Sequence, residues 1–394
     1  MKVLIINSGS SSIKYQVIGM PLEEVICEGM VERIGSVDAI LKYKTKKVAI
    51  TETIEINNHE AGLKKIAGLL LDVEKGIIAD ANEIDAVGHR VVHGGITFSK
   101  TTLIDHAVKE KIKQLFALAP LHNPHNLEGI LMAEQIFPYA RQIAVFDTAF
   151  HHTLPVKAKK YALPNELFIK HHIQTYGFHG TSHKYVSEKA IAYLQKKQSK
   201  IITIHLGNGC SITAIKDGKS VDHSMGFAPS NGLIMGSRSG DIDHSIIFYL
   251  VAILGYSLET VNELLVKQSG MQGLTGFSDL RDIQAAAEQG NEECMLALQM
   301  NAYRIKKYIG SYTAAMNGLD AIVFTAGIGE NSAQLRKLVA TDMEYIGIHL
   351  DDSKNNIRTN TLREINTESS KVKVLVIPTN EELEIAKQVF SLAL

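Results

Sequence analysis

The sequence has few cysteines and no long run of apolar residues, and both shortages narrow the class of protein. Its three cysteines, Cys27, Cys210 and Cys294, lie far apart and match neither a disulfide framework nor a zinc-binding spacing. They predict a reducing cytoplasm as the compartment. The most apolar long run, residues 246–256, is well below the ~20 residues that span a bilayer, so we expect a buried helix there and no membrane association. The short apolar run at residues 3–6 cannot form the core of a signal peptide.

The sequence also lacks a large excess of either positive or negative charge. The 41 Lys and Arg against 42 Asp and Glu give a formal net charge of −1, so there is no global field that would favour nucleic acid. The short basic segment 42–47 alternates with other residue types and is expected to form the solvated face of a hairpin. A Walker A loop, a complete G-x-G-x-x-G and an H-E-x-x-H are absent. Most of the 16 histidines are therefore expected to lie at the surface or in hydrogen bonds rather than on a metal.

What the sequence does contain is a repeated pattern of strand, small polar turn and strand. The first copy joins residues 3–6 to residues 13–18 through a turn of Gly and Ser, with Lys14 just after it. The second joins residues 201–206 to residues 211–215 through Gly207-Asn208-Gly209. Such turns offer backbone N–H groups to phosphate without steric bulk, although an ordinary hairpin turn is the alternative for each one alone. Aligning Gly9 on Gly209 gives an offset of 209 − 9 = 200, which predicts two related halves.

The periodicity of apolar residues predicts an α/β protein. Expected strands are 3–6, 15–18, 86–89, 143–146, 201–205, 211–215, 321–325 and 372–377, and expected helices are 60–71, 108–118, 126–137, 183–194, 258–267 and 292–316. Alternation of the two types predicts sheets covered by helices. We expect a boundary near residues 150–155, which gives an N-terminal domain of residues 1–150 and a C-terminal domain of residues 151–380. The final helix, about 381–394, is expected to pack back on the first domain.

Five polar residues stand in settings that suit phosphoryl chemistry. Arg90 and Arg238 lie among glycine and other small residues, where a guanidinium can bind a carboxylate or phosphate or form a structural ion pair. Asp147 follows a strand and is placed to bind magnesium through water, orient an arginine, remove a proton or cap a helix. Glu381 poses a similar choice between a metal and the first turn of a helix. His179, between glycines, can donate to a phosphoryl oxygen.

Six segments in the same order resemble the acetate kinase family, and the resemblance runs from Asn7 to Glu382. The segments are NSGSSSIK at 7–14, GHRVVHGG at 88–95, FDTAF at 146–150, YGFHGTSH at 176–183, HLGNG at 205–209 and GIGEN at 327–331. The resemblance implies a duplicated actin-like (ribonuclease H-like) two-domain fold, with mixed sheets flanked by helices and a nucleotide cleft between the domains. It also implies reversible transfer of the ATP γ-phosphoryl group to acetate by in-line displacement, giving acetyl phosphate and ADP, in a cytoplasmic homodimer that requires Mg²⁺ or, in its place, Mn²⁺.

The resemblance also assigns roles to individual residues. Asp147, His179 and Arg238 match catalytic positions, and Asn7 and Glu381 match the magnesium positions. Arg90 matches the carboxylate-binding arginine, with Val92, Leu121, Phe178 and Pro229 around the acetate methyl group. The nucleotide positions are Ser10, Ser12, Lys14, His205, Leu206, Gly207, Asn208, Gly209, Asp279, Leu280, Arg281, Gly327, Ile328, Gly329, Glu330 and Asn331.

Some residues depart from the family pattern. Ser8 and His125 stand where alanine is frequent, Ser230 and Asn231 replace an expected Leu-Glu, and His244 stands where proline is common. Ser230 and Asn231 follow Pro229, so they bear on the choice of acyl chain rather than on the reaction. A kinase for propionate or butyrate is therefore the nearest alternative, since one methylene changes binding by only about 1–3 kcal/mol. An actin-like ATPase that acts on no organic acid is the alternative from another class.

Acetate is already ionised at neutral pH, so its oxygen can attack phosphorus without losing a proton. A general base is therefore unnecessary. We expect Asp147 to act through magnesium or an arginine, although the family assigns a proton acceptor or donor to this position.

Overall fold

A computed structural model describes residues 1–393, and the chain forms two compact units. Unit 1 consists of residues 1–150 together with the segment that begins at Asn380, and unit 2 consists of residues 151–379. Within the described residues, the strands form one sheet in each unit. The predicted α/β class is therefore confirmed.

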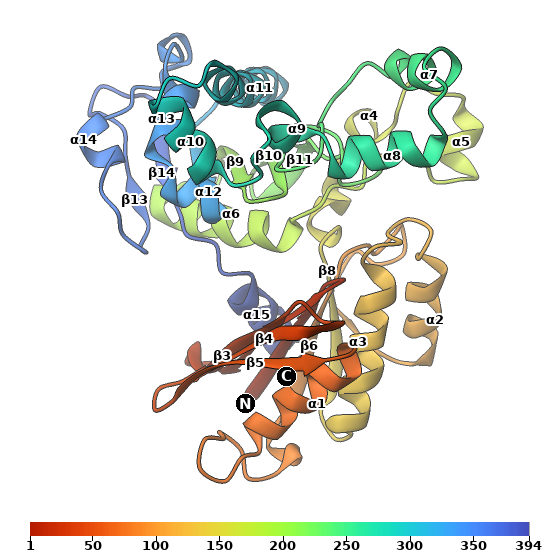
Figure 1. The fold of residues 1–394 in the computed structure, drawn as a ribbon. Helices are drawn as coiled ribbons and strands as arrows, with labels where there is room; N and C mark the ends of the chain where they lie inside the picture. Colours follow the sequence, from red (N-terminus) through yellow and green to blue (C-terminus); the bar gives the residue numbers. More distant parts are fainter. Residues whose placement is uncertain (394) are drawn as a thin grey trace. The chain divides into compact units, whose positions relative to one another are not determined.

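The sheet of unit 1 is built around the first predicted hairpin. Its strands are β1 (Lys2–Ser8), β2 (Ser12–Gly19), β3 (Glu24–Glu32), β4 (Ser36–Thr45), β5 (Ala49–Ile56), β6 (Ala86–Val91), β7 (Thr102–Leu103) and β8 (Arg141–Phe146). Their order across the sheet is β5-β4-β3-β2-β1-β6-β8-β7, and Figure 1 labels β3, β4, β5, β6 and β8 among them. Strands β1 to β5 pair antiparallel in sequence, whereas β6 pairs parallel with β1 and with β8. The carboxyl ends of β1, β6 and β8 therefore lie at one edge of the sheet.

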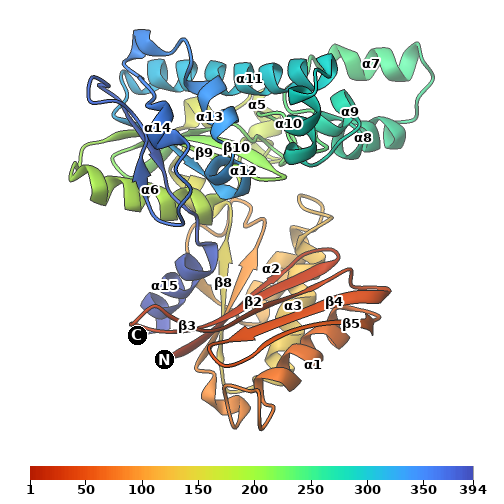
Figure 2. The same cartoon turned by 60° about the vertical axis from the view of Figure 1, so that its left-hand side comes forward.

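Helices cover both faces of this sheet, as Figure 2 shows. They are α1 (His59–Leu70), α2 (His106–Gln114), α3 (Asn123–Ile136) and α15 (Glu381–Ala393), with a 3-10 turn at Ala81–Glu83. Apolar side chains of α1 and α3 pack with Leu4 and Ile6 in one core. On the opposite face α15 approaches so closely that a Cβ at Gly88 would lie 2.8 Å from a methyl group of Val389. Glycine at position 88 thus allows the last helix to pack on the sheet.

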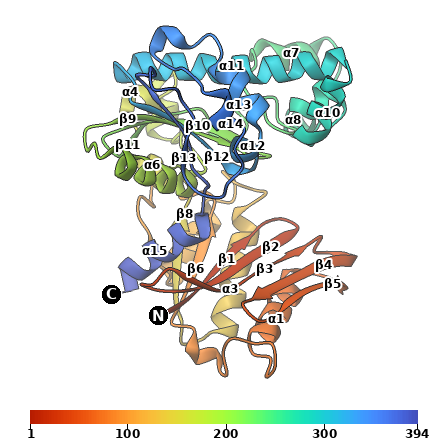
Figure 3. The same ribbon diagram turned by 90° about the vertical axis from the view of Figure 1, so that its left-hand side faces the viewer.

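The sheet of unit 2 contains β9 (Lys200–Leu206), β10 (Cys210–Lys216), β11 (Lys219–His223), β12 (Ala321–Thr325), β13 (Arg363–Glu364) and β14 (Lys373–Val376). Its order is β11-β10-β9-β12-β14-β13, and Figure 3 labels all of these strands except β14. The helices of this unit are α4 (Val156–Lys159), α5 (Asn165–Ile169), α6 (Gly180–Leu194), α7 (Ser245–Ala252), α8 (Leu258–Lys267), α9 (Gly270–Thr275), α10 (Leu280–Glu288), α11 (Glu292–Met316), α12 (Ala326–Asn331), α13 (Ala333–Ala340) and α14 (Asp352–Asn355), with 3-10 turns at Ala149–Thr153 and Glu344–Ile346.

The two sheets share one topology. The order β3-β2-β1-β6-β8 in unit 1 matches β11-β10-β9-β12-β14 in unit 2, with the same pattern of antiparallel and parallel pairs. This confirms the predicted pair of related halves. The exact offset of 200 is wrong, because Ser8 pairs with Ile13 whereas Leu206 pairs with Cys210. The strand ends are thus offset by 206 − 8 = 198 and 210 − 13 = 197, and the duplication is one of architecture rather than of residue-by-residue spacing.

The expectation of a buried helix at residues 246–256 is wrong. The residues form α7 and the loop after it, and Phe248, Tyr249 and Ile253 are 68%, 56% and 66% exposed. The physical reason is that α7 packs beside α8, which leaves most of its apolar surface uncovered. Throughout residues 1–393, every helix is too short or too polar to span a bilayer.

The basic segment 42–47 does form one side of a solvated hairpin. Lys42 and Lys44 on β4 contact Glu32 and Glu28 on the paired strand β3, and Lys46, just after β4, contacts Glu24. These cross-strand pairs neutralise the lysines locally.

Candidate active site

Three neighbouring strands of unit 1 place polar side chains together at the edge described above. Asn7 lies near the end of β1, Arg90 near the end of β6, and Asp147 directly after β8. The Arg90 guanidinium donates from Nε to Asp147 Oδ1 (3.1 Å), from Nη2 to Asp147 Oδ2 (2.5 Å) and from Nη1 to Asn7 Oδ1 (3.2 Å). Two parallel hydrogen bonds to one carboxylate fix the plane of the guanidinium. Of the alternatives for Asp147, the structure therefore favours orientation of an arginine.

Arg90 keeps donors for a further anion. A guanidinium has five N–H groups, and the contacts described for Arg90 use three of them. Burial by itself lowers the pKa of Arg90, but the negative charges of Asp147 and Glu381 outweigh that effect and raise it. The side chain is therefore a permanent cation with an edge available to a carboxylate.

Negative charge exceeds positive charge around Arg90. Glu381 Oε2 lies 3.7 Å from Arg90 Nε, and Glu382 Oε1 lies 2.6 Å from Lys14 Nζ, so three carboxylates with Asp147 face two cations. Burial raises the pKa of Glu381 to about 7, and the charges of Asp147 and Glu382 add to that effect against the opposing charges of Arg90 and Lys14. A hard divalent cation would offset this excess, and carboxylate and amide oxygens are the ligands it prefers. Glu381 and the Asn7 amide oxygen therefore fit the predicted magnesium site.

Hydrogen bonds fix the backbone of the serine-rich turn after β1, and part of the turn is exposed to solvent. The Gly9 N–H donates to the Ser12 carbonyl (2.8 Å), and Asn126 Nδ2 donates to the Ser8 carbonyl (2.7 Å). Ser10 is exposed and Ser12 is half-buried. The fixed backbone and open hydroxyl groups keep this turn suited to phosphate, as the sequence predicts.

In unit 2, His179 lies directly before α6 in a left-handed backbone conformation with φ of 54°. Its ring stacks on His205, with centroids 4.2 Å apart, and its Nδ1 lies 2.9 Å from Ser211 Oγ. A non-glycine residue in this conformation is strained, and such strain is common at functional sites. The tertiary contacts of the ring hold His179 in place.

Three buried histidines that the sequence did not single out support this arrangement. His183 Nε2 lies 2.7 Å from the same Ser211 Oγ, and His183 Nδ1 lies 2.7 Å from Thr203 Oγ1. His223 and His151 continue the cluster, with His223 Nε2 accepting from the Phe178 N–H (3.1 Å) and His151 Nε2 lying 2.9 Å from the Phe178 carbonyl. Burial lowers the pKa of His183 and of His223 well below the usual value, so both rings are neutral. In the sequence, His183 ends the segment YGFHGTSH, and polar residues alternate with apolar ones at Thr203 and His205 on β9 and at Ser211 and Thr213 on β10.

We expect Ser211→Ala to lower the unfolding free energy by about 1–3 kcal/mol, because the buried His183 and the partly buried His179 lose their shared hydroxyl partner. It should also lower kcat by about tenfold with little change in the KM for acetate, because His179 loses its orientation rather than a contact with the acid. Urea unfolding and steady-state kinetics measure the two effects. Ser224→Ala is the matched control, since Ser224 Oγ accepts from the Ile212 N–H (3.0 Å) on the same strand. An equal kcat loss in both variants would contradict a positioning role for Ser211.

Arg238 lies beside the second glycine turn. Its Nη1 donates to the Pro229 carbonyl (2.8 Å). A Cβ at Gly209 would lie 3.3 Å from His179 Cε1 and 3.9 Å from Arg238 Nη1, so the turn passes close to both side chains. Burial lowers the pKa of Arg238 from its ordinary value, which still leaves a cation at neutral pH. Unit 2 therefore brings together His179, His205, Gly209, Pro229 and Arg238.

Some residues of the predicted nucleotide segments of unit 2 line one small cavity of about 20 Å³. Its walls include Leu206, Gly207, Asn208, Leu280 and Ile328, from the regions after β9, at the start of α10 and within α12. The segment that contains Gly327 and Gly329 forms the short helix α12.

The remaining nucleotide candidates lie around these elements. Asp279 caps α10 and pairs with the exposed Arg281 (2.5 Å). Glu330 accepts from the Thr379 N–H (3.0 Å), and Asn331 donates to the Gly327 carbonyl (2.8 Å). Gly329 is buried in α12.

The four predicted acyl-pocket residues are divided between the units. In unit 1, Val92 is buried and its N–H donates to Asn126 Oδ1 (3.0 Å), whereas Leu121 is 55% exposed. In unit 2, Phe178 is buried and Pro229 contacts Arg238 through its carbonyl.

Comparison with known proteins decides the family. The model of the acetokinase family matches residues 2–387. The chain belongs to the acetokinase family. It is 64% identical over 392 residues to the acetate kinase of Flavobacterium johnsoniae, with 100% of this chain and 99% of that protein covered.

Solved structures of this acetokinase family have the same fold. The acetate kinase of Porphyromonas gingivalis superposes with a TM-score of 0.93 at 44% identity, covering 99% of each chain. A propionate kinase from Francisella tularensis superposes with a TM-score of 0.92 at 43% identity, again covering 99% of each chain. The fold is the actin-like two-domain fold of these kinases, and the chain is a phosphotransferase of the acetokinase family.

Proposed function

We propose that this chain is an acetate kinase that reversibly transfers the γ-phosphoryl group of ATP to acetate, giving acetyl phosphate and ADP. The observation that carries the proposal is the Arg90 guanidinium, oriented by Asp147 and Asn7 at the ends of three adjacent strands. The 64% identity to an acetate kinase over the full chain supports it.

Unit 1 supplies the site for the organic acid. Arg90 binds the acetate carboxylate through the N–H groups that Asp147 and Asn7 do not use, and Val92 and Leu121 contact the methyl group. Because acetate is ionised at neutral pH, Asp147 holds Arg90 in position and need not remove a proton. Catalysis then depends on the position of the acetate oxygen and on stabilisation of charge on the phosphoryl group.

Asn7 and Glu381 would hold Mg²⁺, with Mn²⁺ able to replace it. When bound, the ion would neutralise negative charge on the phosphate oxygens. The raised pKa of Glu381, caused by burial and neighbouring carboxylates, supports this assignment because it marks a negative charge without full compensation.

Unit 2 supplies the nucleotide site and the cations for the transferred group. The segments that bind the nucleotide contain His205, Asn208, Leu280 and Ile328. The phosphates of the nucleotide bind to Ser10, Ser12 and Lys14 of unit 1. His179 and Arg238 stabilise the charge that develops on the phosphoryl oxygens. Phe178 and Pro229 complete the apolar contacts of the acyl group.

The proposal predicts that protein, Mg-ATP and acetate in the presence of hydroxylamine accumulate acetohydroxamate, because hydroxylamine traps acyl phosphates. Colorimetric detection of the hydroxamate, together with ADP release, measures the reaction. Omission of acetate is the control. ATP hydrolysis that is independent of acetate and yields no hydroxamate would contradict the proposal and favour an actin-like ATPase.

Propionate is the second candidate substrate, because a propionate kinase has the same fold at 43% identity. Ser230 and Asn231, which follow the pocket residue Pro229, are where the chain departs from the family pattern. One methylene changes binding by only about 1–3 kcal/mol in such pockets. The same assay with propionate and butyrate ranks the three acids by kcat/KM, and a preference for propionate or butyrate would reassign the substrate while keeping the reaction.

The proposed enzyme acts in the cytoplasm as a homodimer. The exposed apolar side chains Phe248, Tyr249 and Ile253 on and after α7 support self-association, because large exposed apolar patches commonly mark protein interfaces.

A further inference from the structure

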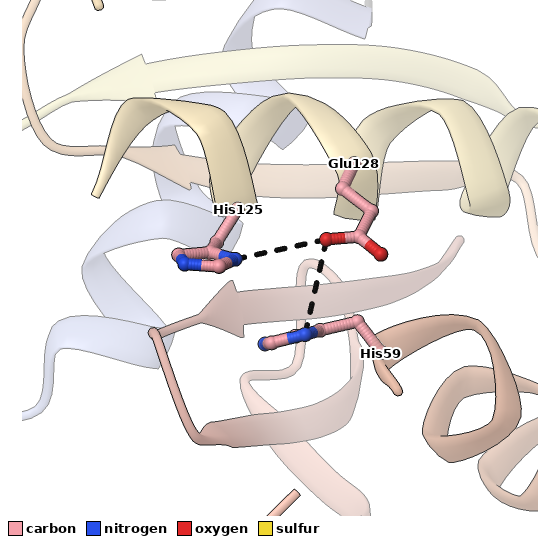
Figure 4. Close-up of side chains that lie close together, drawn as sticks. All are labelled: His59, His125 and Glu128. Carbon is pink, nitrogen blue, oxygen red and sulfur yellow. Dashed lines mark ion pairs between the residues drawn. The ribbon is translucent and has the colours of Figure 1, made fainter. Parts of the chain in front are cut away.

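Two histidines and one glutamate meet between α1 and α3 of unit 1 (Figure 4). His59 begins α1, and His125 and Glu128 lie one turn apart on α3. Glu128 Oε2 lies 3.8 Å from His59 Nδ1 and 3.7 Å from His125 Nδ1. One ligand atom of each of the three residues lies within 4.8 Å of the others. The proposed reaction uses none of these side chains.

The hydrogen bond of His59 leaves Nδ1, the ring nitrogen that faces Glu128, able to bind a metal. His59 Nε2 lies 2.6 Å from the Gly9 carbonyl oxygen. A carbonyl only accepts, so Nε2 carries the proton and Nδ1, which faces Glu128, presents its lone pair. Metal-binding histidines typically donate their other N–H to a backbone carbonyl or a carboxylate in this way.

The burial of the three side chains is consistent with a site that an ion can enter. His59 is buried, whereas the side chains of His125 and Glu128 are 32% and 42% exposed. The two imidazole rings stack, with centroids 4.9 Å apart and planes at 21°, so both Nδ1 atoms can face the same carboxylate. Zinc requires its ligand atoms at ~2.0–2.2 Å from the ion, so the partly exposed side chains of His125 and Glu128 would need to rotate towards it.

The ligand set selects the type of ion. Two imidazoles with one carboxylate suit Zn²⁺ and similar transition ions, whereas Mg²⁺ prefers oxygen ligands. Three protein ligands leave the fourth tetrahedral position to water.

We propose that His59, His125 and Glu128 bind one Zn²⁺ ion at a site separate from the proposed magnesium site. The ion links α1 to α3. Through the bond from His59 to the Gly9 carbonyl, it also stiffens the serine-rich turn at residues 9–12. The proposal does not depend on the identity of the acid that the enzyme phosphorylates.

The test measures zinc binding to the full chain after treatment with a chelator, with excess Mg²⁺ present to occupy the magnesium site. Calorimetry of the wild type should show one zinc ion per chain. His125→Ala and Glu128→Gln alter partly exposed side chains of α3 and should leave the fold intact. Each should weaken zinc binding by more than about 100-fold, because even the loss of hydrogen-bond partners around metal ligands costs about 10–100-fold. His106→Ala, at an exposed histidine elsewhere in unit 1, is the matched control and should bind zinc like the wild type.

Hydrogen exchange gives a second readout that does not depend on activity. Zinc should slow amide exchange at residues 9–12 in the wild type and in His106→Ala, but not in His125→Ala. Absence of zinc binding to the wild type, or equal affinity in the wild type and in either ligand variant, would overturn the proposal. Binding that survives in Glu128→Gln alone would overturn the three-ligand site.

Discussion

Asp147→Asn is expected to lower kcat/KM for acetate by about 10²–10⁴-fold at every pH at which the enzyme is folded. The variant keeps the size of the side chain but replaces a carboxylate that accepts two N–H groups of Arg90. Hydrogen bonds to charged groups contribute about 1.5–3 kcal/mol each, so two of them account for about 3–6 kcal/mol. Each 1.36 kcal/mol corresponds to about tenfold in rate. Steady-state kinetics between pH 6 and pH 9, measured with the hydroxamate assay, provide the test.

The shape of the pH profile distinguishes two roles for Asp147. An arginine-orienting carboxylate predicts a uniform loss, because Arg90 remains charged throughout this range. A loss confined to low pH would contradict that role and support proton transfer by Asp147. Asp217→Asn is the matched control, because Asp217 occupies a left-handed turn at φ of 53° that asparagine also tolerates. Its kinetics should equal those of the wild type.

Acid is expected to unfold this protein at a pH at which its carboxylates are still largely ionised. Burial lowers the pKa of five histidines: to about 4 for His89, His93 and His151, and well below the usual value for His183 and His223. These rings stay neutral in the folded chain but bind protons near pH 6.5 when unfolded. The unfolded state therefore binds more protons below pH 6.5, and stability falls as the pH falls from about 6.5 towards 4.

The expected size of this effect is large. Each fully titrating histidine contributes about 1.4 kcal/mol per pH unit, so five contribute about 7 kcal/mol per unit near pH 5. Glu381 opposes the trend, because its pKa of about 7 makes the folded state bind an extra proton between about pH 4.5 and pH 7. The net loss remains several kcal/mol per unit.

Urea unfolding at pH 7.5, 6.5 and 5.5 measures the change, and the slope of stability against pH gives the number of protons taken up on unfolding. NMR titration of the imidazole resonances identifies the rings that stay neutral in the folded protein. A stability that stays flat between pH 7.5 and pH 5.5 would show that these rings are already protonated when folded, contrary to the prediction.

The central strands were predictable because they are uniformly apolar. The strand at 321–325 and the helices at 258–267 and 292–316 were predicted with the bounds that the structure has. The strands β3 and β5 were not predicted. Only Cys27 and Val31 of β3 and Ile56 of β5 are buried, and both strands include charged side chains, so they lack the apolar run that marked the central strands.

The candidate site, like the fold, was only partly predictable from the sequence. Arg90 and Asp147 stood out individually because each follows an apolar strand, but the sequence left open whether Asp147 would bind a metal, cap a helix or orient an arginine. They are 57 residues apart, and only the parallel pairing of β6 with β8 brings their side chains together. The roles assigned by family resemblance to residues such as His205 and Asp279 stay predictions.

The sequence by itself determined the α/β class, the duplicated core and the family, because apolar periodicity and ordered motifs are local properties that a chain carries in any conformation. The tertiary structure alone decided which charged groups pair, that α7 is exposed, that five histidines are buried and neutral, and that His59 meets His125 and Glu128. These properties depend on contacts between residues distant in the chain. The free energy of each ionised or apolar group is therefore set by neighbours that the local sequence does not specify.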